Sequence, residues 1–418
     1  MSTSCTRRTD CRLCGCHNLT LALPIAASPI GDQYKSADQL KITQPSYPLD
    51  LFLCDQCGHL QLLDVLPPDL LFGDYTFVTA SSAGLVEHFR RHAEDVVRRT
   101  NPPAGSLVVE IGSNDGTLLR FYQALGLRTL GIDPAAEIAA QASAANCETL
   151  PMFFTREVAE RIRRERGAAA IVEANNVYAH VDDIAELTDA IRLLLAPNGV
   201  FVFEVSYLVD MIDKKLFDTV YHEHLSYHSL VPLERFFSAH GLALFDVDRI
   251  STKGGSIRGF VQHRDGPRSR TSAVDELLGV ERARGMARID TFRAFADDLQ
   301  LVKARLHEQL SSIRAGGGEV AGFGASVTVT TLLHHFSLGG VIDYLVDDNP
   351  AKHGLYSPGL HLPVRDSRVI HERPPAAVVI LAWQYADAIM KKHARYLDAG
   401  GRFVVPLPDV RVVASRAP

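Results

Sequence analysis

The sequence of 418 residues lacks long apolar runs and clusters of basic residues. It contains no stretch of about 18 uninterrupted apolar residues, and its N-terminus lacks the apolar segment of a secretory signal. The net charge is -6, and no basic run is long enough to follow a phosphate backbone. We therefore expect a cytoplasmic protein that has neither a membrane nor a nucleic acid as a partner.

Cysteine is rare beyond the N-terminal segment. Six of the seven cysteines lie within the first 57 residues and only Cys147 lies elsewhere, which argues against a disulfide framework across the fold. Cys11 and Cys14 form one CxxC pair, and Cys54 and Cys57 form a second. Two such pairs can present four thiolates to one tetrahedral ion, so we expect a structural zinc site with these four ligands. Four reduced thiols without a metal, or a redox role, are the alternatives.

Apolar patterning divides the chain into four segments. Residues 1–75 are rich in Cys and Pro and have only short apolar runs, which indicates a small domain around the metal. Residues 76–265 alternate strand-like and helix-like runs, the pattern of a parallel sheet. Residues 266–315 have helical spacing of apolar positions among many charges, which predicts one or two connecting helices. Three glycines end this helical run, and residues 316–418 form a second α/β unit.

A glycine-rich loop, GSNDG at residues 112–116, follows the predicted strand Leu107–Ile111 and leads into a helix. Its glycines allow a ligand to approach the backbone closely, and the helix N-terminus offers free N–H groups. Glu110 ends this strand, and Asp133 ends the next strand, where a carboxylate can accept both hydroxyls of a ribose. This combination predicts S-adenosylmethionine as the ligand. The loop departs from the GxGxxG spacing of dinucleotide folds, and NAD is the alternative.

Other candidate donor-site residues follow neighbouring strands. Asn175 and Asn176 end a predicted strand at the carboxyl edge of the sheet, although each could be a turn residue. Phe153 and Phe154 could flank an adenine or belong to the core. The residues that we expect to contact the donor are Glu110, Gly112, Asn114, Asp115, Gly116, Asp133, Pro134, Phe154 and Asn175. The predicted fold is α/β, with a zinc-binding domain, a Rossmann-like class I methyltransferase domain and a C-terminal Rossmann-like domain.

The stretch YHEHLSYH at residues 221–228 concentrates groups that can transfer protons. It holds three histidines, two tyrosines and a glutamate, and histidine can act as a base near neutral pH. Composition alone does not identify the base. His222 and His224 could instead bind a metal, or the histidines could cap a helix and bond to the backbone.

Together these motifs resemble the S-adenosylmethionine-dependent C-methyltransferases that act on nucleotide-linked keto-deoxysugars in antibiotic pathways, typified by the TDP-sugar C-3'-methyltransferases. The resemblance extends over nearly the whole chain. It rests on the joint order of CRLCG, CDQCG, FGDYTFVTASS, VVEIGSNDGTLLR, GIDPA, EANNVYAHV, FDTVYHEHLSYHSL, GGS, GFGAS, VDDNPAKHG and LAWQYAD.

The resemblance implies methylation of the carbon next to the 4-keto group of a TDP-linked deoxysugar. A base removes the α proton, and the enolate takes the methyl group of S-adenosylmethionine. By matching motif positions, His224 would be the general base, and Tyr221 and Glu223 would support the base or the enolate. The residues that would line the sugar site are Tyr75, Asn176, His180 and His222.

One position departs from the family's pattern. The first loop of the C-terminal domain usually carries a lysine, which is replaced by Thr328. Because this change removes a positive charge near an anionic substrate, it favours an alternative, methylation of a carbon, oxygen or nitrogen in a metabolite without a nucleotide. A third hypothesis is a scaffolding protein that binds zinc and S-adenosylmethionine without catalysis.

Overall fold

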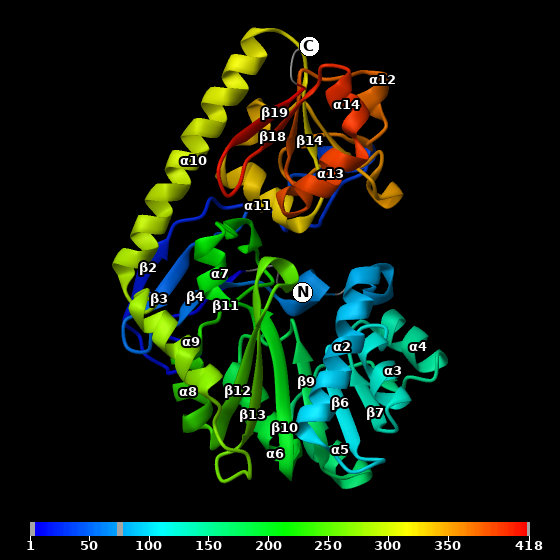
Figure 1. Ribbon diagram of the computed structural model, residues 1–418, viewed down its shortest axis with the longest axis vertical. Helices are drawn as coiled ribbons and strands as arrows, with labels where there is room; N and C mark the ends of the chain where they lie inside the picture. Colours follow the sequence, from blue (N-terminus) through cyan, green and yellow to red (C-terminus); the bar gives the residue numbers. More distant parts are fainter. Residues whose placement is uncertain (1–4, 73–77, 416–418) are drawn as a thin grey trace.

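The middle part of the chain forms a seven-stranded sheet in the computed structural model, which describes residues 5–72 and 78–415. This sheet lies in the lower half of the molecule as viewed in Figure 1. Its strands lie side by side in the order β12 (Leu242–Ile250), β13 (Ser256–His263), β10 (Leu195–Ser206), β9 (Ala169–Asn175), β6 (Leu107–Ile111), β7 (Arg128–Ile132) and β8 (Thr149–Leu150). β13 is antiparallel to both neighbours, and the other neighbouring pairs are parallel. All five residues of β6 are buried, as expected for a central strand covered on both faces.

Helices cover both faces of this sheet. They are α2 (Ala83–Thr100), α3 (Thr117–Ala124), α4 (Ala136–Ala144), α5 (Arg156–Arg166), α6 (Ile184–Leu194) and α8 (Leu230–Ala239). Helix α7 (Leu208–Asp213) follows β10 and lies beyond the end of the sheet, towards the C-terminal unit (Figure 1). Successive residues of β6 point to opposite faces, so Val108 packs in the cluster under α2 and α3, whereas Val109 packs in the cluster under α5, α6 and α8. The parallel strands therefore present their carboxyl ends, and the loops that follow them, at one shared edge.

One strand of the N-terminal sheet comes from the central part of the chain. Its antiparallel sheet has the order β11-β4-β3-β2, formed by β2 (Leu19–Leu23), β3 (Leu51–Cys54), β4 (Leu60–Leu62) and β11 (Ser226–Tyr227). Two short strands, β1 (Thr6–Arg7) and β5 (Asp64–Val65), pair beside it, and α1 (Pro68–Phe72) follows. Because β11 comes directly after residues 221–225, the N-terminal sheet holds the histidine-rich stretch in place.

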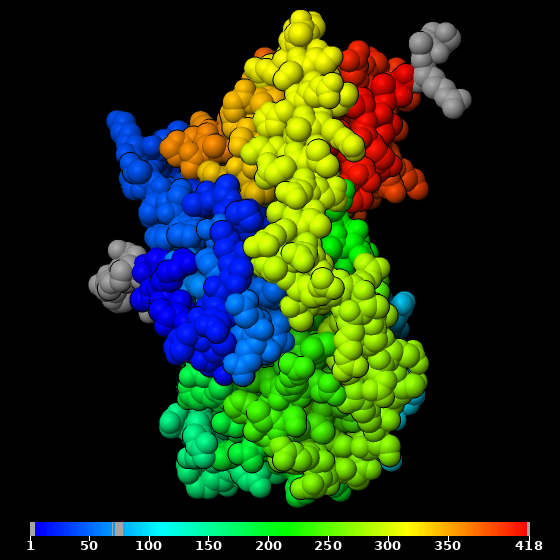
Figure 2. Space-filling view, turned by 90° about the vertical axis from the view of Figure 1, so that its left-hand side faces the viewer, coloured from blue at the N-terminus to red at the C-terminus, as the bar shows by residue number. Residues whose placement is uncertain are grey.

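Two helices occupy the predicted connecting segment, α9 (Ser272–Ala283) and α10 (Ile289–Ala315). The buried side chains of α10 recur every three or four residues, from Phe292 to Ile313, and form one apolar stripe. α10 packs against β2, and Figure 2 shows it running along the N-terminal segment from the central sheet to the C-terminal unit. It ends at Ala315, which confirms the predicted stop at the three glycines.

The C-terminal unit is a second α/β fold with the strand order β16-β15-β14-β17-β18-β19. Its elements are β14 (Val320–Phe323), α11 (Val327–His335), β15 (Tyr344–Asp347), β16 (Val364–Asp366), α12 (Val369–Glu372), β17 (Ala377–Ile380), α13 (Ala386–Lys392), α14 (Ala394–Asp398), β18 (Arg402–Val405) and β19 (Arg411–Ala414). Only β19 is antiparallel to its neighbour. The sequence-based α/β fold class, with its three parts, is confirmed.

Side-chain hydrogen bonds join the C-terminal unit to the rest of the molecule. Trp383 Nε1 donates to Asp218 Oδ2 over 2.9 Å, and Thr331 Oγ1 donates to the carbonyl of Val220 over 2.7 Å. Thr330 Oγ1 donates to the carbonyl of Gly31 over 2.7 Å. The predicted domain boundaries at residues 75, 265 and 315 stay predictions. Within the described ranges, no helix combines the length and the apolar composition needed to cross a membrane.

Candidate functional site

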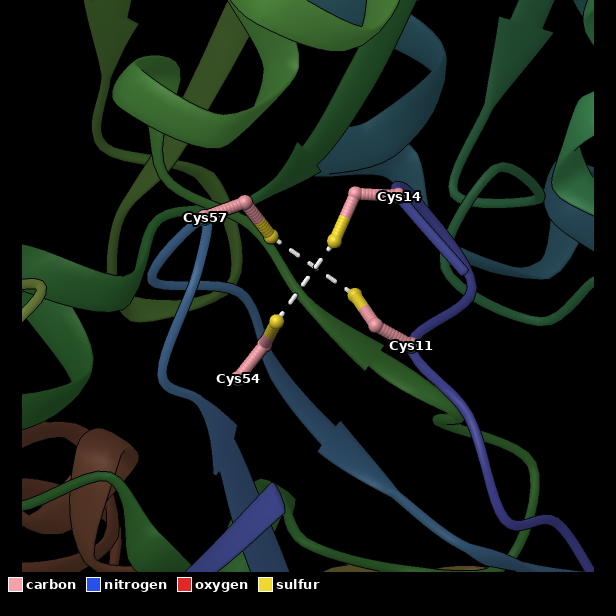
Figure 3. Close-up of side chains that lie close together, drawn as sticks. All are labelled: Cys11, Cys14, Cys54 and Cys57. Carbon is pink, nitrogen blue, oxygen red and sulfur yellow. Dashed lines mark hydrogen bonds between the residues drawn. The ribbon is translucent and has the colours of Figure 1, made fainter. Parts of the chain in front are cut away.

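The four predicted zinc ligands point their sulfur atoms toward a common centre (Figure 3). The Sγ atoms of Cys11 and Cys57 lie 3.6 Å apart, and those of Cys14 and Cys54 lie 3.5 Å apart. In each CxxC turn, the N–H of the following glycine donates to the carbonyl of the first cysteine. Four thiols converge without forming disulfides, which fits one tetrahedral ion. Four protein ligands leave no open coordination position, so the site is structural.

The loop after β6 has the strained backbone that its glycines permit. Gly112 and Gly116 have φ angles of 70° and 73°. A Cβ atom at Gly112 would lie 2.3 Å from Val177 Cγ2, and one at Gly116 would lie 2.5 Å from Cys147 Sγ. Asn114 has φ 49°, in the left-handed region that asparagine tolerates better than most residues. A larger side chain at either glycine would therefore displace the loop.

Side chains of this loop bind the segment that precedes α2. Asn114 Oδ1 accepts from the N–H of Thr79 over 2.9 Å, and Asp115 Oδ2 accepts from the N–H of Ala80 over 2.9 Å. The N–H of Asn114 donates to Asp133 Oδ2 over 2.8 Å. Burial raises the pKa of Asp133. The loop, the start of α2 and the end of β7 thus form one hydrogen-bonded frame.

This frame borders a cavity of about 400 Å³ at the carboxyl edge of the sheet. The predicted site residues that line it are Glu110, Gly112, Asn114, Asp133, Pro134, Phe154, Asn175, Asn176, His180, Tyr221, Glu223 and His224. Residues from the predicted donor loop, residues 112–116, and from the histidine-rich stretch therefore share one cavity, although about 100 residues separate them in sequence.

Three buried polar atoms in this cavity have no hydrogen-bond partner among the described residues: Glu110 Oε2, Ser113 Oγ and Asn175 Oδ1. Buried polar atoms are normally paired, so unpaired ones around a cavity indicate a polar ligand. Burial, followed by repulsion from Glu173, raises the pKa of Glu110 well above its usual value. With the Asp133 carboxylate, these groups fit the amino acid and ribose parts of S-adenosylmethionine.

A buried network fixes the orientation of Asn175. Its Nδ2 donates to Glu173 Oε2 over 3.1 Å, so the amide oxygen remains for the cavity. Glu173 also bonds to His92 Nε2 over 3.0 Å, and His92 Nδ1 bonds to Glu204 over 2.9 Å. Burial opposes the charged form of His92, but the Glu173 charge raises its pKa. His88, His92 and Glu204 lie close enough to hold a metal, and Arg258 also forms an ion pair with Glu204 over 2.6 Å.

His224 has the geometry of a base. Its Nδ1 donates to the carbonyl of Thr219 over 2.8 Å, which leaves Nε2 of the neutral imidazole without a proton. The ring lies between Tyr221, with centroids 4.0 Å apart, and His180, with centroids 5.0 Å apart. Burial lowers the pKa of His224 to about 4, so the imidazole is neutral at physiological pH. The neighbouring Glu223 has its pKa raised to about 7 by burial.

Three predicted site residues lie outside the described lining of this cavity. Asp115 and Gly116 are absent from the described lining and shape the loop instead. His222 faces the N-terminal segment, where its ring meets Tyr47 edge to face with centroids 5.7 Å apart. Tyr75 lies outside the described residues. The roles assigned to the predicted catalytic, substrate-binding and donor-binding residues stay predictions.

Sequence reasoning missed two features of this site. Lys253, which precedes the GGS motif, lines the cavity, but a single lysine has no spacing that predicts a role. Thr79 also lines it and binds Asn114 through both its N–H and its hydroxyl. Its motif, FGDYTFVTASS, contributed only to the resemblance. The polar character of TASS before a helix could have predicted a cap, and Ser82 is indeed the cap of α2.

Family comparisons cover all parts of the chain. A model described as a methyltransferase domain matches residues 85–247, one described as a zinc binding domain matches 11–72, and one described as a C-methyltransferase C-terminal domain matches 251–408. C-methyltransferase NovU of Streptomyces niveus is 35% identical over 415 residues, which are 98% of this chain and 97% of that protein.

Solved structures with similar folds share little sequence. Magnesium protoporphyrin IX methyltransferase ChlM from Synechocystis, with bound S-adenosylmethionine, is 14% identical over 46% of this chain and 86% of its own, with a TM-score of 0.32. An S-adenosylmethionine-dependent methyltransferase from Clostridium acetobutylicum is 11% identical over 48% of this chain and 96% of its own, with a TM-score of 0.35.

The seven-stranded sheet with one antiparallel strand, its donor loop and the methyltransferase match define a class I S-adenosylmethionine-dependent methyltransferase. Identity to NovU over nearly the full length of both proteins then makes the family clear. The chain belongs to the S-adenosylmethionine-dependent C-methyltransferases. It is an enzyme that uses S-adenosylmethionine and holds a structural zinc ion at its four cysteines.

Proposed function

We propose that the enzyme methylates the carbon next to the ketone of a nucleotide-linked 4-keto-deoxysugar in antibiotic biosynthesis. S-adenosylmethionine supplies an electrophilic methyl group on a sulfonium. The acceptor carbon must become a nucleophile, and the α proton of a ketone is acidic enough for a side chain to remove. The observation that carries the proposal is the single cavity that joins the donor loop to Tyr221, Glu223 and His224.

In the proposed reaction, Nε2 of His224 takes the α proton. The electron pair of the C–H bond forms the carbon–carbon double bond of the enolate, and the carbonyl oxygen takes the negative charge. The enolate carbon then bonds to the methyl carbon, and the pair of the broken carbon–sulfur bond stays on sulfur. The ketone reforms, and His224 releases its proton to solvent. The net products are the methylated ketone, S-adenosylhomocysteine and one proton.

Neighbouring side chains support these steps. The Thr219 carbonyl holds the His224 tautomer that exposes the basic nitrogen. Tyr221 stacks on His224 and limits its rotation. Glu223, with a pKa of about 7, can accept a proton from the imidazolium and pass it to solvent. Asn176 and His180 line the same cavity and would contact the sugar.

Incubation with a TDP-linked 4-keto-deoxysugar and S-adenosylmethionine carrying a deuterated methyl group tests the proposal. We expect one labelled methyl group on the α carbon, located by mass spectrometry and NMR. His224→Asn should bind the donor like the parent and lose transfer, whereas His222→Asn should affect thermal stability more than turnover. Absence of transfer to every 4-keto-sugar nucleotide, with donor binding intact, would refute the substrate class.

A second candidate acceptor is a ketone without a nucleotide. Thr328 stands at the start of α11, and the N–H of Ala325 in the same loop already donates to the Asp347 carboxylate over 2.7 Å. A carboxylate in this position repels a phosphate. Titration with TDP by calorimetry separates the two candidates. Measurable TDP affinity supports the nucleotide-linked substrate, and its absence with an active enzyme supports the second candidate.

A further inference from the structure

Lys253 lies in the loop between β12 and β13, where a one-turn helix spans Thr252–Gly254. It lines the cavity that also contains Tyr221, Glu223 and His224. Among the described residues that line this cavity, Lys253 is the one lysine or arginine, whereas several are acidic. A negative charge that develops inside the cavity therefore has Lys253 as its one lysine or arginine neighbour among the described lining residues. Burial lowers the pKa of Lys253, and the charges of Glu204 and Glu223 oppose this shift by favouring the ammonium form.

The backbone at Lys253 is unusual for a residue with a long side chain. Its φ and ψ angles are 52° and 34°, in the left-handed region. Gly254 and Gly255 follow with φ angles of 86° and 149°. Glycine would adopt the conformation at position 253 without strain, so a strained lysine among glycines indicates that the side chain itself is needed.

The loop is held firmly by contacts outside the cavity. Lys214 Nζ donates to the carbonyl of Gly254 over 2.6 Å, and the N–H of Tyr207 donates to the carbonyl of Gly255 over 3.1 Å. A Cβ atom at Gly255 would lie 2.3 Å from Asp210 Cγ. These contacts fix the point from which the Lys253 side chain starts, as a catalytic group requires.

Lys253 also lies beside the proposed base. A small second cavity of about 20 Å³ shares two lining residues, His224 and Lys253, with the first. Burial is the main cause of the lowered pKa of His180 and His224, and the charge of Lys253 lowers both pKa values further. The same charge opposes the rise in the Glu223 pKa that burial causes. The ammonium group is thus within electrostatic reach of three side chains around the reaction centre.

We propose that Lys253 is a catalytic residue whose ammonium group donates a hydrogen bond to the acceptor carbonyl oxygen and stabilises the enolate. The inference rests on the proposed function. While His224 takes the α proton, the carbonyl π electrons move onto oxygen, and Lys253 keeps its proton and holds that negative charge. When the carbon takes the methyl group, the oxygen electrons reform the carbonyl. A preorganised donor at a developing oxyanion is among the larger contributions to catalysis.

Three variants of the full-length enzyme test this role: Lys253→Met, Lys253→Arg and Lys253→Gly. The readouts are kcat and KM for methyl transfer, and exchange of the α proton with deuterium oxide in the absence of the donor. We expect Lys253→Met to lower both kcat and the exchange rate by about 100-fold. The affinity for S-adenosylmethionine should stay unchanged, and Lys253→Arg should recover part of the exchange.

Lys253→Gly distinguishes loss of catalysis from loss of folding. Glycine relieves the left-handed strain, so this variant should melt at a higher temperature than the parent while losing exchange. Added methylamine should restore part of its activity, which a purely structural lysine would not allow. Lys215→Met is the matched control, because Lys215 also has a left-handed backbone, with φ 55°, but does not line the cavity, and its exchange rate should stay within about threefold of the parent.

The outcomes separate the two proposals. An active parent enzyme whose Lys253→Met variant keeps its exchange rate refutes the role of Lys253. A higher KM with unchanged kcat also refutes it and indicates binding of another anionic group of the substrate. A parent enzyme that neither exchanges nor methylates any keto-sugar fails at the proposed function itself.

Discussion

The two α/β units contain similar edges with different neighbours. In the central unit, Asp133 at the end of β7 accepts from the N–H groups of Asn114 and Ala135 over 2.8 and 2.9 Å. In the C-terminal unit, Asp347 at the end of β15 accepts from the N–H groups of Ala325 and Asn349 over 2.7 and 2.8 Å. Each carboxylate therefore joins its glycine-rich loop to the neighbouring strand in the same way.

What lies against each edge differs. The donor loop borders a cavity of about 400 Å³ that contains unpaired buried polar atoms. The start of α11 is instead covered by the N-terminal segment, since a Cβ atom at Gly31 would lie 2.5 Å from Val327 Cγ2. Lys352 also pairs with Asp32 of that segment over 2.6 Å. A strand, a glycine loop and a carboxylate therefore predict a backbone geometry, and only the surroundings show whether a ligand or the chain itself fills the space.

The largest difference in donor affinity between the two units should come from substitution of their loop glycines, Gly112 and Gly322. Gly112→Ala places a methyl group against Val177 in a left-handed conformation, so we expect donor affinity to fall by about 100-fold. In Gly322→Ala, where the backbone is not left-handed, the new methyl group meets the side-chain ends of Leu381, Leu345 and Ile342, at 2.6, 2.8 and 3.5 Å. That variant should lose about 1–3 kcal/mol of stability and keep its donor affinity. Calorimetry with S-adenosylmethionine and thermal melts measure both; equal losses of affinity would contradict the contrast.

Loss of zinc should affect catalysis more than donor binding. β11, which follows His224, pairs with β4 of the N-terminal sheet, and β3 of that sheet ends at the zinc ligand Cys54. Cys54→Ser should therefore misplace His224 and lower methyl transfer by about 10- to 100-fold, with donor affinity nearly unchanged. Cys16→Ser, in the same segment but outside the cluster, is the control. If Cys54→Ser lost zinc and kept full activity, the N-terminal sheet would not position the base.

The analogous carboxylates Asp133 and Asp347 allow a direct comparison of the two α/β units, with a smaller expected effect. Asp133→Asn removes the charge expected to accept the ribose hydroxyls, so donor affinity should fall about tenfold, or about 1.4 kcal/mol. Asp347→Asn changes the same kind of backbone contact at the other edge and should leave donor affinity within about twofold. Isothermal titration measures the donor affinity of both variants. A larger loss of affinity in Asp347→Asn than in Asp133→Asn would place the donor at the edge of the C-terminal sheet.

Acidification should weaken donor binding gradually. Burial raises the pKa of Asp133, so its carboxyl group takes up a proton at a higher pH than an exposed aspartate does. Because only the ionised form accepts two hydroxyl groups, affinity should be highest above the folded pKa and fall as the pH is lowered through it. We expect a loss of about twofold when the pH reaches that pKa. Asp133→Asn should abolish this dependence, and Asp347→Asn should keep it; a pH profile unchanged by Asp133→Asn would exclude this carboxylate.

Local spacing explains what the sequence could predict. Two CxxC pairs and a GSNDG loop after an apolar strand are contiguous patterns with a fixed geometry, so Cys11 to Cys57 and Gly112 to Gly116 could be interpreted directly. The apolar positions of α10 recur at helical spacing and predicted its course. These patterns need no knowledge of distant parts of the chain.

Long-range contacts explain what the sequence could not predict. The two-residue strand β11 pairs Ser226 with Gln61. A segment this short has no recognisable alternation of apolar and polar residues, so its sequence could not predict a strand. Neighbours within the histidine-rich stretch also face different ways, since His224 lines the cavity and His222 meets Tyr47. Lys253 reaches the cavity from a loop between two strands, where no motif marks it. Each of these placements depends on how separate segments pack.

A crystal structure with S-adenosylhomocysteine tests the central claim that donor and base share one cavity. We expect the ribose against Asp133 and the sulfur facing His224, with His224 Nε2 and Lys253 bordering the space left for the methyl group and the acceptor. A ligand bound at the edge of the C-terminal sheet, or a sulfur facing away from Tyr221 and His224, would contradict it.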